Sequence, residues 1–362
     1  MMNLLSKYLI PPYKISITKD KLNRQFYQPE IAFDTSKYNS LTKTIEKQII
    51  EDQGFLDTEI LKFDSLLNYL RDTIEEKLAA YFSNKSQKAF LYIRDWMIYR
   101  IIGLEHLMPL LIDDNVQEIY LDKPKTPLYI DHQDFGRCLT NIILSESELD
   151  RLKTRLCLEK DTILNILHPS LKVELKTIHF HIRAAIDIPP LANDGLCMNI
   201  RKLRKKIWTL PELIKMNMLT TEAASYLLFI MRRRINFTVI GEPGSGKTTL
   251  ANAIDLLTPP QWRKITIEDV IESIEQTQFN KFQTRYSVSP FDSKIASHSK
   301  SDEIIKLLHR SPSWVFLGEI QTAEHSNALF EALSAGLVGL QTCHGRSAEM
   351  MILRWVNQHK IP

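Results

Sequence analysis

Hydrophobic residues recur at steps of three and four over two stretches in the first half of the chain. From Leu56 to Phe82 they form one face of a helix, and a similar spacing runs from Ser86 to about Gly103. From Val116 to Ile130 apolar and polar residues alternate instead, which is typical of strands. The pattern therefore predicts a mixed α+β domain over 55–200.

The segments on either side of that domain have a different character. Residues 1–54 show no clear periodicity, and we expect a loosely structured, strand-poor extension. Residues 201–212 carry five cations between Arg201 and Lys206, a composition that suits a linker or an interface as well as a solvated charge run. The rest of the chain, 213–362, is expected to form a second domain.

The composition narrows the class of protein. A chain of 362 residues with 44% hydrophobic and 25% charged residues matches globular averages, so disorder and fibrous repeats are not indicated. No apolar run approaches the roughly 20 residues that span a bilayer, and no signal peptide is evident, so a cytoplasmic protein is expected. The net charge of +3 does not by itself indicate a nucleic-acid partner. Four widely spaced cysteines without a CxxC pair predict reduced thiols rather than a zinc site: Cys138, Cys157, Cys197 and Cys343.

A glycine-rich loop carries the first chemical signal. Gly241–Thr248 matches GxxxxGK[ST] in full and lies between an apolar run, Ile235–Ile240, and a helical segment, Thr248–Leu257. Backbone N–H groups of such a loop bind phosphate, Lys247 would reach the β- and γ-phosphates, and Thr248 would hold Mg²⁺. The alternative is a glycine-rich turn with a surface lysine. The expected nucleotide-binding residues here are Gly241, Gly244, Ser245, Gly246, Lys247, Thr248 and Thr249.

Two short predicted strands end in carboxylates. Lys264–Ile267 is followed by Glu268, and Trp314–Leu317 is followed by Gly318 and Glu319. The carboxyl ends of parallel strands share one edge with the phosphate loop, so both glutamates are expected to face the γ-phosphate and its metal. We expect Glu268 to orient or deprotonate water and Glu319 to assist through the metal, although the sequence leaves this division open. A pair of capping carboxylates is the alternative.

A third apolar run, Leu337–Cys343, ends in His344. The imidazole could sense bound phosphate by hydrogen bonding, or it could cap the helix that follows Ser347. Taken alone, the position favours a cap or a packing role.

Four blocks in this order resemble the secretion ATPase superfamily of type II and type IV secretion, type IV pili and archaella, and are most similar to its archaeal branch. The blocks are a Walker A motif at Gly241–Thr248, an acidic box at Thr266–Glu272, an atypical Walker B motif at Gly318–Ile320 and a histidine box at Thr342–His344. The resemblance covers about 104–360. It implies an α/β fold, with a C-terminal RecA-like P-loop motor domain behind a smaller N-terminal α+β domain.

The resemblance also implies a function. The expected protein is a hexameric motor that hydrolyses ATP with Mg²⁺, held by Thr248 and Glu319, to drive secretion or the assembly of a pilus-like filament. It would lie in the cytoplasm at the inner face of the membrane, against a polytopic membrane platform protein, with nucleic acid an unlikely partner. Arg201 and Arg204 would clamp phosphate charge, and His344 would contact the nucleotide.

Two other functions stay open. One is a conjugative DNA-transfer ATPase that uses the basic runs Arg201–Lys206 and Arg232–Arg234. The other is a non-hydrolysing ATP-binding scaffold, because the chain departs from the superfamily pattern at several positions and turnover is therefore in more doubt than ATP binding. The departures are His309, Ser313, Gln321 and Leu337.

The superfamily resemblance includes one expectation about the end of the chain. Relatives continue beyond the helix that matches Ser347–Val356, whereas this sequence stops at Pro362. The motor domain is therefore expected to be shortened, and to self-associate or need a partner that covers the apolar side of this helix.

Overall fold

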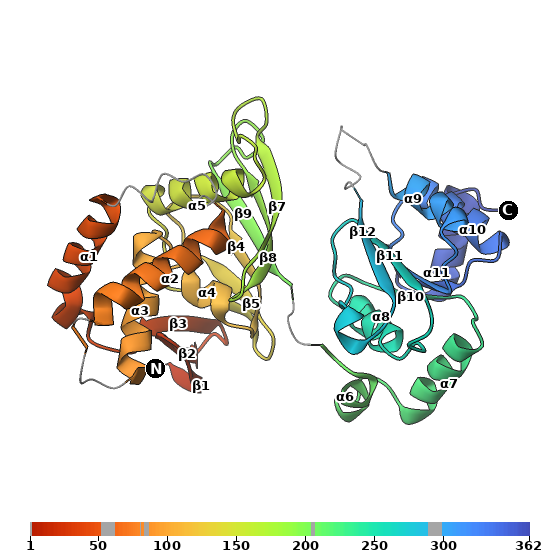
Figure 1. Ribbon diagram of the computed structural model, residues 1–362, viewed down its shortest axis with the longest axis horizontal. Helices are drawn as coiled ribbons and strands as arrows, with labels where there is room; N and C mark the ends of the chain where they lie inside the picture. The colour runs from red at the N-terminus through yellow and green to blue at the C-terminus, as the bar shows by residue number, and fades with distance from the viewer. Residues whose placement is uncertain (1, 52–61, 80, 83–86, 204–206, 289–298) are drawn as a thin grey trace. The chain divides into compact units, whose positions relative to one another are not determined.

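A computed structural model describes residues 2–51, 62–79, 81–82, 87–203, 207–288 and 299–362. The chain divides into two compact units, Met1–Lys205 and Lys206–Pro362, which Figure 1 colours from red to green and from green to blue. The boundary falls inside the basic segment 201–212. In the described part of the chain, no helix is both long and apolar enough to cross a bilayer.

The first unit is built on a mixed sheet of nine strands in the order β1-β2-β3-β6-β5-β4-β9-β8-β7. Neighbours are antiparallel except β3 and β6, which pair in parallel over Gln25–Tyr27 and Cys138–Thr140. The strands are β1 (Asn3–Ile10), β2 (Tyr13–Lys19), β3 (Gln25–Ile31), β4 (Val116–Leu121), β5 (Tyr129–His132), β6 (Gly136–Thr140), β7 (Ser170–Lys176), β8 (His181–Asp187) and β9 (Cys197–Lys202).

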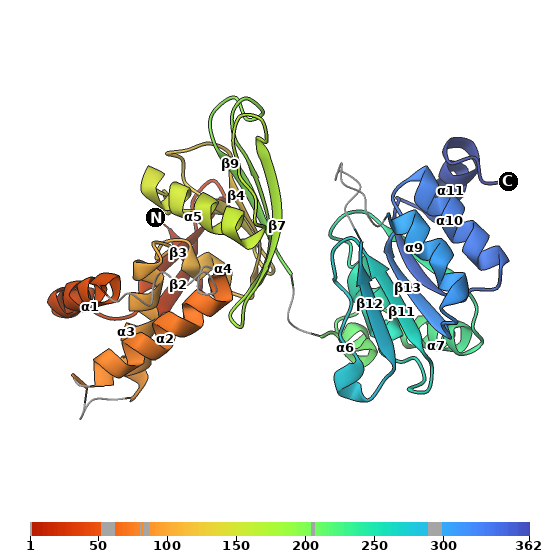
Figure 2. The same cartoon turned by 45° about the horizontal axis from the view of Figure 1, so that its top comes forward.

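Helices cover one side of this sheet (Figures 1 and 2). Buried and less buried residues alternate along β7 and β8, as expected when one face packs on helices. The helices are α1 (Asn39–Glu51), α2 (Phe63–Ala79), α3 (Gln87–Ile101), α4 (Met108–Ile112) and α5 (Glu146–Glu159). The two predicted amphipathic helices are confirmed as α2 and α3, although residues 56–61 of the first prediction lie outside the described residues.

The expectation of a strand-poor N-terminal segment is wrong. The strands β1, β2 and β3 lie within residues 3–31, and the apolar side chains Tyr13, Ile15 and Ile17 alternate into the core. A buried carboxylate anchors these strands, because Tyr8 Oη and Tyr27 Oη both donate hydrogen bonds to Asp113 Oδ2, at 2.6 and 2.9 Å. The N-terminal strands are therefore part of the same sheet and core as the residues that follow.

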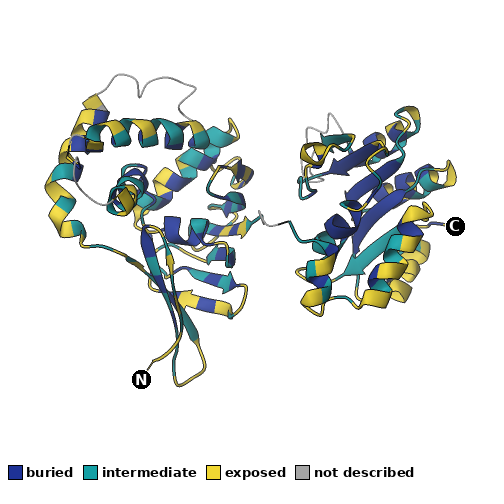
Figure 3. Cartoon of the chain, turned by 60° about the horizontal axis from the view of Figure 1, so that its bottom comes forward, coloured by how far each residue is buried: buried dark blue, intermediate teal, exposed yellow. Residues whose placement is uncertain are grey.

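The second unit contains a parallel sheet of five strands in the order β10-β14-β13-β11-β12. They are β10 (Phe237–Gly241), β11 (Lys264–Glu268), β12 (Gln283–Ser287), β13 (Trp314–Glu319) and β14 (Gly339–His344). The helices are α6 (Leu210–Lys215), α7 (Thr221–Arg232), α8 (Lys247–Asp255), α9 (Lys300–Lys306), α10 (Ala323–Ser334) and α11 (Ala348–Leu353), the last continued by a π-helical turn, Arg354–Gln358. Residues of β11 are buried throughout, and those of β13 and β14 are buried except at their last positions, as in sheets covered on both faces (Figure 3).

A buried polar network joins α8 to two central strands. Asp255 accepts hydrogen bonds from Lys264 Nζ at 2.8 Å, Gln276 Nε2 at 2.6 Å and Trp314 Nε1 at 2.9 Å. Lys264 and Asp255 are both 1% exposed. Because a buried charge needs a partner, this network fixes α8, and hence the phosphate loop before it, to the sheet.

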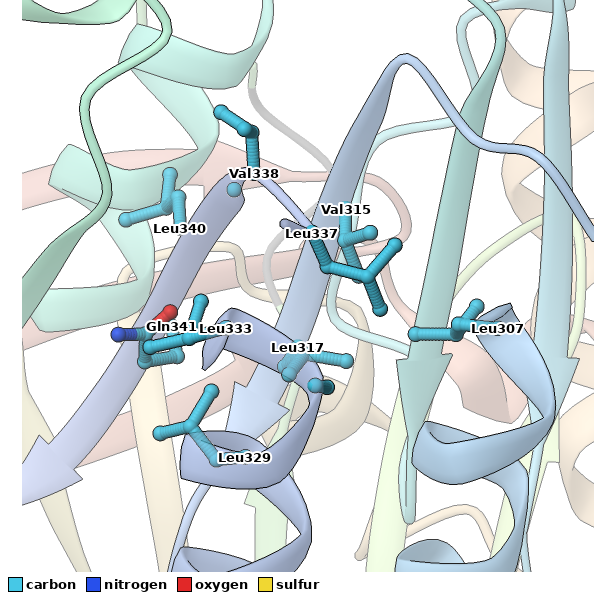
Figure 4. Close-up of a pocket in the computed structure, with 11 residues that line it drawn as sticks. Leu307, Val315, Leu317, Leu329, Leu333, Leu337, Val338, Leu340 and Gln341 are labelled. Carbon is cyan, nitrogen blue, oxygen red and sulfur yellow. The ribbon is translucent and has the colours of Figure 1, made fainter. Parts of the chain in front are cut away.

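A void of about 10 Å³ lies between α10 and the strands β13 and β14 (Figure 4). Leu317, Leu329 and Leu337 are among its lining residues. Such a small apolar space holds no ligand and is a packing gap.

Candidate ATP-binding site

The glycine-rich loop connects β10 to α8, which is the strand, loop and helix order expected from the sequence. Gly246 is the N-cap of α8 with a positive φ of 89°, and a Cβ there would come within 2.6 Å of Met218 Cε. A side chain at this position would therefore be strained by the positive φ, and the end of the exposed Met218 side chain would have to move. Gly241, Gly244, Ser245 and Gly246 form the loop, while Lys247, Thr248 and Thr249 form the first turn of α8, where backbone N–H groups favour anions.

His344 lies at the end of β14, directly beside Gly241 at the end of β10. Lys247 Nζ is 3.1 Å from His344 Nδ1 and donates to the carbonyl oxygen of Glu242 at 2.9 Å. The other ring nitrogen, His344 Nε2, contacts Glu319 Oε1. The structure thus brings the expected lysine, histidine and Walker B glutamate into one continuous row.

The helix-capping alternative for His344 is wrong. The N-cap of α11 is Ser347, whose hydroxyl accepts a hydrogen bond from the backbone N–H of Met350. His344 is the last residue of its strand, and its ring faces the loop lysine and Glu319.

Glu268 ends β11 and is 3% exposed. Its carboxylate accepts hydrogen bonds from the backbone N–H groups of Glu272 at 3.2 Å and Ser273 at 3.1 Å, so it also caps the turn that follows the strand. Burial raises the pKa of Glu268 to about 7, against the opposite effect of these hydrogen bonds. A carboxyl group with a pKa near neutrality can exchange a proton at physiological pH.

Gly318 allows the two acidic strand ends to approach each other. A Cβ at this position would lie 2.9 Å from Glu268 Cγ. The pairing register of β13 with β14 shifts between Leu317 and Glu319, as at a β-bulge, and bulges commonly redirect side chains next to functional sites.

Lys300, at the start of α9, is a site residue that the sequence did not reveal. Its ammonium donates to the backbone carbonyl of Glu319 at 2.7 Å and lies 3.5 Å from Asp269 Oδ1, with the side chain 1% exposed. The surrounding residues Ser299, Ser301 and Asp302 are polar, so the sequence gives no sign that Lys300 is buried. Only the tertiary structure brings this lysine to the carboxyl ends of β11 and β13, where Glu268, Asp269 and Glu319 form the acidic edge of the sheet.

The oxygen donors near the loop fit Mg²⁺. Thr248 supplies a hydroxyl and Glu319 a carboxylate, and Mg²⁺ commonly takes one or two such protein ligands together with phosphate oxygens and water. No group of three His, Cys, Asp or Glu suited to a metal occurs among the described residues.

The expected arginine clamp lies in the first unit. Arg201 is an exposed residue of β9, paired in register with Glu118 of β4 and Arg183 of β8. Arg204 lies outside the described residues. A role for either residue at the phosphate loop stays a prediction.

The departures from the superfamily pattern occupy different places. Gln321 lies at the site, where its Nε2 donates to Glu319 Oε2 at 2.7 Å and adds no charge. Leu337 lines the apolar void (Figure 4), and Ser313 immediately precedes β13, so both lie at the amino end of the sheet, away from the phosphate loop.

A family model described as type II/IV secretion system protein matches residues 114–358 of the chain. The chain belongs to this family. The match contains all four sequence blocks and begins within the N-terminal unit, so the family assignment covers parts of both units.

Two curated proteins that are similar to the chain share less than 30% of its residues over the aligned region. The chain is 26% identical over 323 residues to an uncharacterized protein of Methanocaldococcus jannaschii, covering 85% of this chain but only 42% of that protein. It is 28% identical over 272 residues to the type IV secretion system protein PtlH of Bordetella pertussis, covering 69% of this chain and 79% of PtlH.

The solved structure of the pilus retraction motor PilT with bound ADP is similar in fold, with a TM-score of 0.51 and 20% identity over 70% of this chain and 72% of that chain. This likeness supports the two-domain architecture expected of the family, an α+β domain before a RecA-like α/β domain.

Proposed function

We propose that this protein is an ATP-hydrolysing motor of a secretion or pilus-assembly machine. The observation that carries the proposal is the row Lys247, His344 and Glu319, placed at the carboxyl edge of a parallel sheet beside a complete phosphate loop. A loop used only as a structural turn would not need this arrangement of a cation, an imidazole and a carboxylate.

The residues divide the chemistry among them. Lys247 and the N–H groups at the start of α8 bind the phosphates, and Thr248 and Glu319 would hold Mg²⁺, which would neutralise charge on the phosphoryl group. Glu268 orients a water molecule and accepts its proton as the water oxygen bonds to the γ-phosphorus. The bond from that phosphorus to the bridging oxygen breaks, giving ADP and inorganic phosphate.

The wider role is inferred by analogy with the family. We infer a homo-oligomer, a hexamer by analogy with secretion ATPases, that works at the inner face of the cell membrane against a polytopic membrane platform protein. PtlH belongs by name to a type IV secretion system and PilT is a pilus retraction motor. Its membrane partner decides whether this chain drives secretion or filament assembly.

Phosphate release by the purified protein tests the proposal. We expect Mg²⁺-dependent hydrolysis of ATP that the Glu268→Gln variant loses while still binding nucleotide. If the wild-type protein binds ATP and never turns it over, the motor function is wrong and the scaffold alternative holds.

One observation favours a second function, DNA transfer. Arg232, Arg233 and Arg234 are exposed, and within the described residues none of them forms an ion pair. Arg233 lies over the ring of Phe229 and Arg234 over that of Trp262, at 5.2 and 5.8 Å, and basic groups next to aromatic rings suit single-stranded nucleic acid.

Single-stranded DNA added to the ATPase assay decides between the two functions. Stimulation that falls steeply with salt, and that a triple Arg232→Ala, Arg233→Ala, Arg234→Ala variant loses, would favour DNA transfer. Turnover that is insensitive to DNA supports the secretion motor.

A further inference from the structure

Lys300 has an environment unlike that of the other cations near the acidic edge. Lys247 faces His344, and Arg354 donates to the carbonyl oxygens of Gln321 and His344 at 3.0 and 3.4 Å. Lys300 is instead 1% exposed and reaches between two strand ends, to the peptide oxygen of Glu319 and the carboxylate of Asp269.

Three carboxylates crowd the same edge. Glu268 and Asp269 are consecutive at the end of β11, and Gly318 brings Glu268 against the end of β13, where Glu319 follows. Against the effect of burial, the negative charges of Asp269, Glu268 and Glu319 each favour the charged form of the Lys300 ammonium. The burial of this cation is tolerable because these partners surround it.

We propose that Lys300 is a positioning residue for ATP hydrolysis, which joins the ends of β11 and β13 and balances the charge of the carboxylates that they carry. It acts through Glu268 and Glu319 and does not touch the nucleotide itself. This inference rests on the proposed function, because positioning of these carboxylates matters only if they serve hydrolysis.

The mechanism predicts a loss that is specific to the transition state. ATP binding depends on the phosphate loop, to which Lys300 makes no contact among the described residues. Alignment of the water and the metal depends on Glu268 and Glu319, and a displacement of about 1 Å in such groups can cost about 10²-fold in rate. Lys300 should therefore affect kcat much more than the dissociation constant of ADP.

Three substitutions separate charge from packing. Lys300→Met keeps the apolar stem and removes both charge and hydrogen bonds, Lys300→Gln restores only a neutral donor, and Lys300→Arg restores the charge. Lys306→Met is the matched control, because Lys306 is on the same helix but is 51% exposed and pairs with Glu303 at 2.7 Å.

The measurements are kcat, the dissociation constant of ADP, and that of ADP with aluminium fluoride, which imitates the transferring phosphoryl group. We expect Lys300→Met and Lys300→Gln to lower kcat by about 10²-fold and to weaken the aluminium fluoride complex in parallel, with ADP affinity within about twofold of wild type. Lys300→Arg should recover most of the loss, and Lys306→Met should change nothing.

Several results would overturn the proposal. Unchanged kcat in Lys300→Gln would show that the charge has no role. Equal losses of ADP binding and of kcat would show a structural role only, and the same conclusion would follow if Lys300→Arg, once shown to be folded by circular dichroism, were as inactive as Lys300→Gln. A wild-type protein without turnover would remove the proposed function and this role together, whereas an active wild type with an active Lys300→Gln variant removes only the latter.

Discussion

Lys247 Nζ and His344 Nδ1 lie 3.1 Å apart, which links the phosphate loop to the last residue of the neighbouring strand. A lysine ammonium only donates hydrogen bonds, so Nδ1 is the acceptor and the ring proton is on Nε2, on the side of Glu319. This tautomer is assigned from the hydrogen-bonding partners. From these contacts we infer that His344 transmits a change at the loop lysine to the Walker B glutamate.

Replacing His344 by Ala should therefore separate binding from turnover. Lys247 keeps its charge, so ADP affinity should change by less than about threefold, while kcat falls by about tenfold or more because Glu319 loses its neighbour. Isothermal titration and phosphate release measure the two quantities. His344→Gln, which retains a donor and an acceptor, should fall between the two proteins, and equal kcat in all three would remove His344 from the mechanism.

Lys247→Ala should abolish tight nucleotide binding. The loop has no second side chain with a positive charge, and loss of a charge-assisted contact of roughly 3 kcal/mol corresponds to about 10²-fold in affinity. Lys215→Ala, at an exposed position of α6, is the control for a lost surface charge. An unaltered ADP dissociation constant in Lys247→Ala would mean that the loop does not bind phosphate.

Glu268 predicts a pH dependence of turnover. Because burial raises its pKa to about 7, the basic form is depleted below neutrality, and kcat should rise through about pH 7 and then level off. Glu268→Gln should lower kcat by about 10²-fold or more and remove this rise. Glu272→Gln is a second test, because the charge of Glu272 also raises the pKa of Glu268. Removing that charge should move the pH at which kcat rises to a lower value. A profile that does not respond to either change would assign the base elsewhere.

The same shift has a consequence for stability. The folded protein holds the Glu268 proton more tightly than the unfolded chain does, so this group contributes most to stability at pH values below the ordinary glutamate pKa. That contribution is lost as the pH rises through about 7. The free energy of unfolding, measured by urea denaturation, should therefore differ less between pH 5 and pH 8 for Glu268→Gln than for wild type.

The Arg201→Ala variant tests whether Arg201 binds the phosphate groups of ATP. If Arg201 holds phosphate charge, the ATP concentration for half-maximal activity should rise several-fold with an unchanged denaturation midpoint. A solvated charge would change any free energy by less than about 0.5 kcal/mol. Lys176→Ala, at an exposed position on β7 of the same sheet, provides the comparison.

Breaking the buried ion pair between Asp255, on α8, and Lys264, on β11, should cause a large loss of stability. Asp255→Ala leaves the Lys264 ammonium buried without its carboxylate, which should cost about 3–5 kcal/mol in urea unfolding. The double variant Asp255→Asn, Lys264→Met removes both charges and keeps an acceptor for Trp314, so it should recover much of that loss. A double variant no more stable than Asp255→Ala would contradict the charge argument.

The sequence predicted the motor domain better than the N-terminal unit. The phosphate loop, the strands ending in Glu268 and Glu319 and the helix after Lys247 depend on local patterns, which short windows of sequence contain. The sequence predicts only that the strand before the phosphate loop and the strand that ends in His344 share one edge of the sheet. It does not predict that His344 contacts Lys247. The partners of His344 and its tautomer required the fold.

The missed features have identifiable physical causes. The alternation of Tyr13, Ile15 and Ile17 is a strand signal, but it is short and follows Pro11 and Pro12, which suggested irregular structure. Lys300 could not be found in this way, because lysines are rarely buried and its partners Asp269 and Glu319 are distant in sequence. Burial of a charge is decided by tertiary packing, not by its neighbours along the chain.

The parallel pair of β3 and β6 determines the order in which the first unit can be completed during synthesis. Gln25 and Cys138 are partners in this pair although 113 residues separate them. The strands β1 to β3 leave the ribosome long before β6 exists, so until then the outer edge of β3 has no partner strand, although the helices that follow can already cover the apolar face of these strands. Docking closes a loop of more than a hundred residues, and contacts of this range slow folding. The edge of β3 must therefore wait for its partner, and a chain interrupted before Thr140 would leave that edge open to pairing with other chains.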